Sequence, residues 1–168
     1  MNYFLETQRL GLRKFVSDDA FFIVELLNTP GWLQFIGDRN VKTAEQAIRY
    51  LEEGPRKSYR QNGFGLWMVE LKEDKTAIGM CGIIKRESLE HPDIGFAFLP
   101  QYFGKGYAFE SASATLSYAK EKLGIEKILA ITIPGNEKSL RLLENIGLSL
   151  KGNISAPAEE KHLLLYST

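Results

Sequence analysis

Apolar and polar residues follow two periods along the N-terminal part of the chain. "RLGLRKF" places Leu10 and Leu12 two positions apart, a spacing that predicts a strand. "DDAFFIVELLN" follows Ser17 and begins with acidic residues, so a helix with Ser17 as its N-cap is expected. Thr43 and Gln46 have the spacing of a capping box, which predicts a second helix over "AIRYLEEG".

The middle of the chain reads as strands. "FGLWMVELKEDKTAIGMCGIIKR" contains two apolar runs joined by a charged turn at residues 72–75, and "DIGFAFLP" adds a third run closed by Pro100. An antiparallel meander is the simplest arrangement of the three. The preceding pair Gly54 and Pro55 is expected to interrupt or end the second helix.

The C-terminal part alternates between segments with the period of a helix and segments with the apolar character of a strand. From Phe109 onward, apolar residues recur every three or four positions, which predicts a long amphipathic helix ended by Gly124. "EKILAITIP" then predicts a strand, "EKSLRLLENIG" a short helix and "HLLLY" a last strand. No repeat or linker interrupts this order. We therefore expect one domain of mixed α and β structure over residues 1–168.

Composition narrows the class of protein. The chain has 168 residues, 44% of them hydrophobic, and 21 basic side chains balance 21 acidic ones. This length suits one well-filled core, and the balanced charge does not favour nucleic acid as a partner. The N-terminus has no apolar signal core, and no apolar run is long enough for a membrane span, so a cytoplasmic protein is expected.

Cys81 is the single cysteine, which excludes an intramolecular disulfide and a thiolate metal cluster. It lies in the apolar run "AIGMCGII", where a buried core residue is a better interpretation than a reactive thiol. No metal site is predicted.

The stretch "LPQYFGKGYAFESA", which begins at Leu99, carries the strongest chemical signal. A strand that stops at Pro100 and a helix that begins near Gly104 bring free backbone N–H groups and the positive end of a helix dipole to one point. This arrangement predicts an anion site, to which Lys105 adds a charge. A Walker loop is excluded because Gly106 follows Lys105, and the dinucleotide fingerprint is excluded by Phe109. A tight turn without a ligand is the alternative.

A resemblance favours the anion site. "QYFGKGYA" resembles the pyrophosphate-binding signature of the GNAT superfamily of acyl-CoA-dependent N-acyltransferases. "ETQRLGLR" and "DIGFAFLP" are similar to the opening and central strands of its ribosomal-protein N-acetyltransferase branch, and "NEKSLRLLENIGL" resembles the segment that follows. The resemblance implies an α/β (α+β) fold with a mixed, mostly antiparallel sheet, a splayed central strand and flanking helices. Acetyl-CoA is the implied cosubstrate.

The resemblance also implies roles for particular residues. The backbones of Phe96 and Phe98 would pair with the pantetheine amides, and Asn136 would hydrogen-bond the pantetheine arm while also suiting a helix N-cap. The pyrophosphate would be held by a larger set, namely Gln101, Gly104, Lys105, Gly106, Tyr107 and Ala108.

The sequence departs from the superfamily at the usual acid. Many members have a Tyr seven residues after the Asn as donor to the leaving thiolate, but this chain has Leu143 there. Ser139 becomes the candidate donor, or else a plain residue of the first helical turn. Glu110 matches a residue common in the branch and is the candidate base, although the helix dipole explains an acid there equally well. Asp93, Glu159, Glu160 and His162 are weaker candidates.

The lack of a strong candidate for the base affects which acceptor amine we expect. Deprotonating a lysine amine at neutral pH costs ~4.6 kcal/mol, against ~1.1 kcal/mol for an α-amine. We therefore expect an N-acetyltransferase acting on a protein N-terminus or a small amine, as a monomer or homodimer. A polyamine or aminoglycoside acetyltransferase and a non-catalytic acyl-CoA-binding module are the alternatives. Trp32 and Phe35 are candidates for the acceptor wall, although core packing is the more ordinary interpretation.

Overall fold

A computed structural model describes residues 2–156 and 161–168 of the chain. In the described residues, a sheet of eight strands runs in the order β1-β2-β3-β4-β5-β6-β8-β7. The strands are β1 (Leu5–Glu6), β2 (Leu10–Arg13), β3 (Leu66–Leu71), β4 (Ala77–Ile84), β5 (Asp93–Phe98), β6 (Leu129–Thr132), β7 (Ser149–Ala156) and β8 (Lys161–Ser167). The helices are α1 (Ala20–Leu27), α2 (Pro30–Phe35), α3 (Ala44–Leu51), α4 (Lys57–Asn62), α5 (Tyr107–Lys122) and α6 (Glu137–Asn145).

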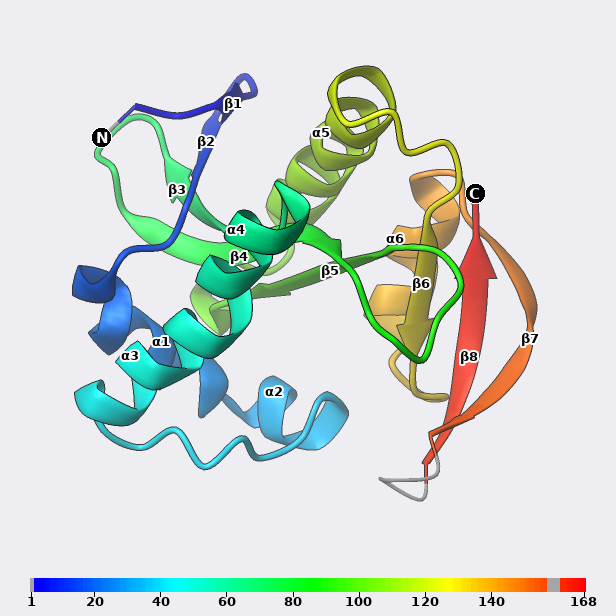
Figure 1. The fold of residues 1–168 in the computed structure, drawn as a ribbon, viewed down its shortest axis with the longest axis horizontal. Coiled ribbons are helices and arrows are strands. Elements are labelled where there is room, and N and C mark those ends of the chain that lie inside the picture. The colour runs from blue at the N-terminus through cyan, green and yellow to red at the C-terminus, as the bar shows by residue number, and fades with distance from the viewer. Residues whose placement is uncertain (1, 157–160) are drawn as a thin grey trace.

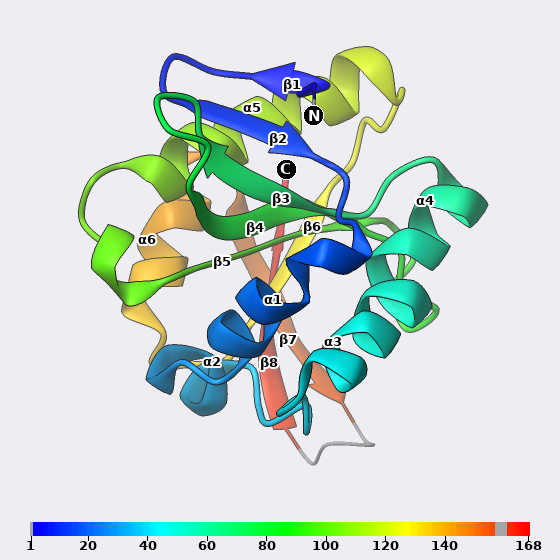
Figure 2. The same ribbon diagram turned by 90° about the vertical axis from the view of Figure 1, so that its left-hand side faces the viewer.

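The helices form a layer on each side of the sheet (Figure 1 and Figure 2). Side chains along β5 point alternately to the two faces of the sheet, so the strand contacts both layers of helices. Ile94 and Phe98 pack in one apolar cluster with residues of α5 and α6, whereas Ala97 and Leu99 pack in a second cluster with residues of α1 and α3. Each layer therefore covers one face of the same strand.

The expected meander is confirmed. Antiparallel pairing joins β3 to β4 and β4 to β5, with the charged turn at residues 72–75 between the first two strands. The capping box of Thr43 and Gln46 is also confirmed, and a π-helical turn at Glu52–Arg56, which contains Pro55, interrupts the helix before α4 begins. Gly124 follows α5 in a left-handed conformation, as expected of a residue that ends a helix.

Three elements were not expected: β1, α2 and β7. β1 has two residues and β7 has mixed polar composition, so neither shows a clear apolar period. The segment of α2 contains Pro30 and Gly31, which read as turn residues, but Pro30 stands at the first position of the helix, where it is tolerated. Phe109 is nearly half exposed, so it lies outside the buried face of α5.

The strands β5 and β6 separate soon after they meet. They are parallel, and Asp93 with Leu129 is the one pair of residues that the described strands share. Figure 1 shows β6, β8 and β7 standing apart from the strands that precede them. The mixed, mostly antiparallel sheet with a splayed central strand is thus confirmed.

A buried ionic network ties β2 and β3 to the start of α1. The Arg13 guanidinium donates to both carboxylate oxygens of Asp19, at 2.9 and 2.8 Å, and to Glu70 at 2.8 Å. Asp19 also accepts a hydrogen bond from the backbone N–H of Val16, at 2.9 Å. The prediction of Ser17 as the N-cap is wrong, because a 3-10 turn at Ser17–Asp19 precedes α1 and Asp19 stands at the N-cap position of the helix. The Ser17 hydroxyl accepts from Arg56 instead.

Replacing Asp19 is expected to destabilise the protein strongly. Asp19→Ala leaves the buried Arg13 charge without its bidentate partner, which costs about 3–5 kcal/mol of unfolding free energy. Urea unfolding followed by circular dichroism measures the change. Glu52→Ala is the control, since it removes a partly exposed ion pair with Arg56 and should cost about 1 kcal/mol or less. Equal losses in the two variants would contradict a stabilising role for the network.

Candidate functional site

The predicted glycine turn lies between β5 and α5. A 3-10 turn at Pro100–Tyr102 follows the strand, and α5 begins at Tyr107 with Gly106 as its N-cap. Gly104 and Gly106 have φ values of 74° and 82°, a conformation that side chains disfavour. No side chain caps the helix at Gly106, so the N–H groups of the first turn of α5 remain available to a ligand.

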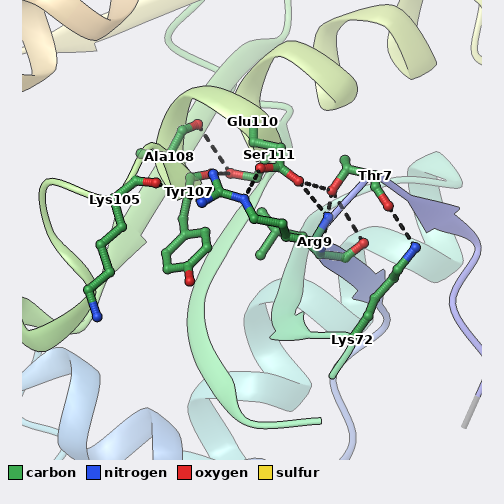
Figure 3. Close-up of polar contacts among 9 residues, drawn as sticks. Thr7, Arg9, Lys72, Lys105, Tyr107, Ala108, Glu110 and Ser111 are labelled. Atoms are coloured by element: carbon green, nitrogen blue, oxygen red, sulfur yellow. Dashed lines mark hydrogen bonds and ion pairs between the residues drawn. The ribbon is translucent and has the colours of Figure 1, made fainter. Parts of the chain in front are cut away.

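The residues predicted to hold a pyrophosphate come together on this turn. Gln101 and Lys105 are exposed, and the Lys105 ammonium lies 5.6 Å from the centre of the Tyr102 ring. Tyr107 and Ala108 are half-buried at the start of α5 (Figure 3). A Cβ at Gly104 would have no atom within 4 Å, so open space surrounds this part of the turn. The turn therefore combines exposed donors, the helix N-terminus and room for a bulky anion.

The backbone of β5 supplies a second row of polar groups. The N–H of Leu99 donates to Ile78 of β4 at 2.9 Å, and backbone directions alternate along a strand. The N–H and C=O groups of Phe96 and Phe98 therefore point away from β4, into the region where β6 has diverged. These groups can pair with an extended ligand that lies along the strand.

On α6, Asn136 and Ser139 lie one helical turn apart. The Asn136 side-chain oxygen accepts from the N–H of Ser139 at 3.4 Å, so Asn136 is the N-cap of the helix. Its amide N–H groups remain as donors, since capping uses only the oxygen. Leu143 is buried in the cluster that includes α5 residues, so a core side chain occupies the position where many superfamily members carry Tyr.

Glu110 lies in the first turn of α5 and makes contacts of a different kind from those of a base. One carboxylate oxygen accepts from the Thr7 hydroxyl at 2.5 Å and from the Arg9 backbone N–H at 2.8 Å, and the other accepts from Arg9 Nε at 2.7 Å (Figure 3). Partial burial acts to raise the pKa of Glu110, but these hydrogen bonds outweigh it and the pKa is lowered. A lowered pKa makes a weaker base.

Arg9 was not among the predicted site residues, although it lies in the quoted segment "ETQRLGLR". Besides Glu110, its guanidinium donates to the carbonyl of Lys105 at 2.9 Å and stacks 4.4 Å from the centre of the Tyr107 ring. These contacts across the fold give Arg9 its place at the turn. Arg9 and Glu110 are 101 positions apart in the sequence, so the local pattern carries no sign of their pairing.

Asp93 is buried at the point where β5 and β6 meet. Arg86 Nε donates to both of its carboxylate oxygens, at 3.0 and 3.2 Å. Burial raises the pKa of Asp93 to about 6, although Arg86 acts in the opposite direction. Asp93 is thus a carboxylate that lies next to the splayed strands and has a pKa near neutrality. Its position in the sequence did not reveal this raised pKa.

The other candidates are placed elsewhere. Trp32 packs in the core cluster of α1 and α3, in agreement with the more ordinary interpretation, and Phe35 is half-buried on the same helix α2. Cys81 is fully buried as expected, and burial raises the pKa of its thiol to about 11. His162 is exposed, whereas Glu159 and Glu160 lie outside the described residues.

Within residues 2–156 and 161–168, no helix combines the length and the apolar character that crossing a membrane requires. In the same ranges, no three or more His, Cys, Asp and Glu side chains gather in a way that would hold a metal ion.

Comparison with known proteins gives consistent matches. A family model described as an acetyltransferase (GNAT) domain matches residues 9–149. The uncharacterized N-acetyltransferase YoaA of Bacillus subtilis is 30% identical over 149 residues, which cover 88% of this chain and 84% of that protein. A GNAT-family acetyltransferase from Bacillus anthracis has a crystal structure that matches with a TM-score of 0.80 and 26% identity, covering 98% of this chain and 96% of that one.

The ribosomal-protein-S5-alanine acetyltransferase from Vibrio fischeri is a further structural neighbour. It matches with a TM-score of 0.81 and 21% identity, over 97% of this chain and 94% of that one. At this identity the likeness concerns the fold alone.

The raised pKa of Asp93 predicts a dependence of stability on pH. Between its ordinary value of 3.8 and about 6, the unfolded chain loses this proton before the folded protein does, so stability falls as pH rises through that window. Asp93→Asn removes the effect. The unfolding free energy of this variant relative to the parent should therefore rise with pH, by at most about 3 kcal/mol in all.

Chemical denaturation at a series of pH values measures this difference. Asp38→Asn is the matched control, because Asp38 is exposed and the backbone N–H of Asn40 lowers its pKa. Its relative stability should change slightly in the opposite direction. A flat difference for Asp93→Asn would show that Asp93 is not a buried carboxylate of raised pKa.

Proposed function

The chain belongs to the GNAT acetyltransferase family, and on this premise we propose that it transfers the acetyl group of acetyl-CoA to a primary amine, either a protein N-terminal α-amine or a small amine. The observation that carries the proposal is the position of the glycine turn at the open end of the gap between β5 and β6. Donors for a pyrophosphate and donors for an extended arm thus lie next to one another along one strand and the helix that follows it.

The residues present fit acetyl-CoA. The free N–H groups of the α5 N-terminus and the charge of Lys105 suit the pyrophosphate. The backbone groups of Phe96 and Phe98 suit the pantetheine amides, since an added strand would bind in the same way. The Asn136 amide N–H groups suit a carbonyl of the same arm.

The proposed chemistry needs a neutral amine and a donor for the leaving thiolate. We assign the donor role to Ser139, which is half-buried on the first turn of α6 next to Asn136. We do not assign the base to Glu110, because its oxygens already accept hydrogen bonds from Thr7 and Arg9. An α-amine places the smallest demand on a base, since its pKa is about 7.8.

An amine panel tests the proposal. The purified protein is incubated with acetyl-CoA and with peptides that carry a free α-amine, spermidine, an aminoglycoside or an Nα-blocked lysine peptide, and release of free thiol is followed. The peptides with a free α-amine should give the highest kcat/KM. Preference for the blocked lysine peptide would contradict the argument from the low pKa of an α-amine, and preference for spermidine or the aminoglycoside would support the polyamine or aminoglycoside alternative. Binding of CoA without any turnover would support the non-catalytic alternative.

Gly106→Asp should weaken the binding of CoA at least tenfold. The substitution adds bulk and a negative charge beside the proposed pyrophosphate, which the helix N-terminus then attracts less well. Isothermal titration calorimetry measures the dissociation constant, expected in the micromolar range for the parent. Gly63→Asp is the matched control, because Gly63 also has a positive φ, of 78°, and lies outside the turn. Unchanged affinity in folded Gly106→Asp would refute the assignment of the turn.

Ser139→Ala should slow acetyl transfer about tenfold to a hundredfold with little change in CoA affinity. A hydroxyl that stabilises the leaving thiolate contributes ~1–3 kcal/mol to the transition state, at ~1.4 kcal/mol per factor of ten. Single-turnover measurements with an accepted amine isolate this step. Ser117→Ala, at an exposed position of α5, is the control. Transfer at the parent rate would leave Ser139 as a residue of the helical turn only.

A further inference from the structure

Arg9 joins the N-terminal hairpin to the glycine turn. It lies between β1 and β2, where its carbonyl accepts from the N–H of Lys72 at 2.9 Å. Its guanidinium reaches across to α5, where Nε binds Glu110 and Nη1 donates to the carbonyl of Lys105 (Figure 3). The side chain is 42% exposed, so these contacts are not those of a core residue.

The bond from Arg9 to Lys105 fixes the direction of one peptide group. The described chain contains no cis peptide bond, and in a trans peptide the C=O and the following N–H point in opposite directions. With the Lys105 carbonyl turned toward Arg9, the N–H of Gly106 is directed away from Arg9. A donor of the turn is thereby directed away from the N-terminal hairpin, and we take this side as the one from which the proposed diphosphate approaches.

Without this bond the peptide has an alternative orientation. Glycine adopts positive and negative φ with similar ease, so rotation of the peptide between Lys105 and Gly106 is not prevented by sterics. The rotated peptide would present the Lys105 carbonyl oxygen to the anion, where its partial negative charge repels a phosphate. A hydrogen bond from a charged donor opposes this rotation.

Arg9 is itself held in position. Glu110 binds it at two atoms, the backbone N and Nε, and the Thr7 hydroxyl donates to the same carboxylate. The Tyr107 ring lies against the guanidinium, and a Cβ at Gly106 would lie 3.3 Å from Nη2. The guanidinium is thus constrained by the hairpin, by α5 and by the turn.

We propose that Arg9 is a positioning residue for diphosphate binding: it orients the peptide between Lys105 and Gly106 so that the turn presents an N–H group, and not a carbonyl oxygen, to the ligand. Glu110 and Thr7 serve this orientation by anchoring Arg9. The inference rests on the proposed function, since it takes the diphosphate of CoA as the ligand.

The experiment compares two ligands and four variants. Calorimetry gives the dissociation constant of CoA, and competition against CoA gives that of inorganic pyrophosphate, which carries only the diphosphate. The variants are Arg9→Ala, Arg9→Lys and, as a control, Arg60→Ala, which removes an exposed arginine paired with Glu52. Thermal unfolding verifies that each variant is folded, and Thr7→Val serves as a milder variant that only loosens the anchor of Arg9.

Arg9→Ala should weaken the binding of both ligands by the same factor, roughly tenfold. Arg9→Lys should stay within about threefold of Arg9→Ala, since an ammonium keeps the charge but cannot bind Glu110 and the Lys105 carbonyl in the same geometry. Thr7→Val should produce a smaller loss of the same kind, and Arg60→Ala none.

Three results would overturn the inference. Parent-like affinity in Arg9→Ala would remove Arg9 from the site, and full recovery in Arg9→Lys would mean that its charge matters and its geometry does not. A loss for CoA without a loss for pyrophosphate would place the effect elsewhere along the proposed CoA site. If the parent binds no CoA, both this inference and the proposed function fail, whereas the first three results leave the proposed function intact.

Discussion

The separation of β5 from β6 is the constraint on which the site depends. Pairing at Asp93 and Leu129 keeps the two halves of the sheet together, and divergence beyond that pair leaves one edge of β5 without a neighbouring strand. An unpaired strand edge buried inside a protein is costly unless something bonds to it. In this chain the backbone groups of Phe96 and Phe98 are held in a fixed row along that edge. The strand thereby packs into the core with both faces and leaves its edge to the ligand that we propose.

Local patterns were sufficient to predict most of the elements. The strands β3, β4 and β5 are continuous apolar runs with clear ends, and the capping box of α3 and the glycine after α5 mark helix boundaries that the structure confirms. The elements that were missed carry weak signals, since β1 has two residues and the polar strand β7 is stabilised by its pairing with β8. Their formation depends on tertiary partners, which a local period does not contain.

The features of the candidate site also divide into those that a local pattern predicts and those that depend on tertiary partners. The glycine turn was predicted because its signal is contained in a few consecutive residues. Glu110 was considered as a base or as a partner of the helix dipole, and its ionic contact with Arg9 was missed because the two residues are 101 positions apart. The pKa of Asp93 likewise depends on burial between strands and on Arg86, neither of which a single sequence reveals. Local backbone geometry was therefore predictable, whereas the electrostatic environment of individual carboxylates was not.

The contact between Arg9 and Glu110 also has a consequence for biosynthesis. The glycine turn is a local motif, but its docking partner Arg9 is synthesised about a hundred residues earlier, and the two can meet only after α5 has been made. Contacts of such long sequence separation form late in folding, because the intervening chain must first be ordered. A nascent or N-terminally shortened chain would thus contain the complete glycine signature while lacking the docked form of the turn.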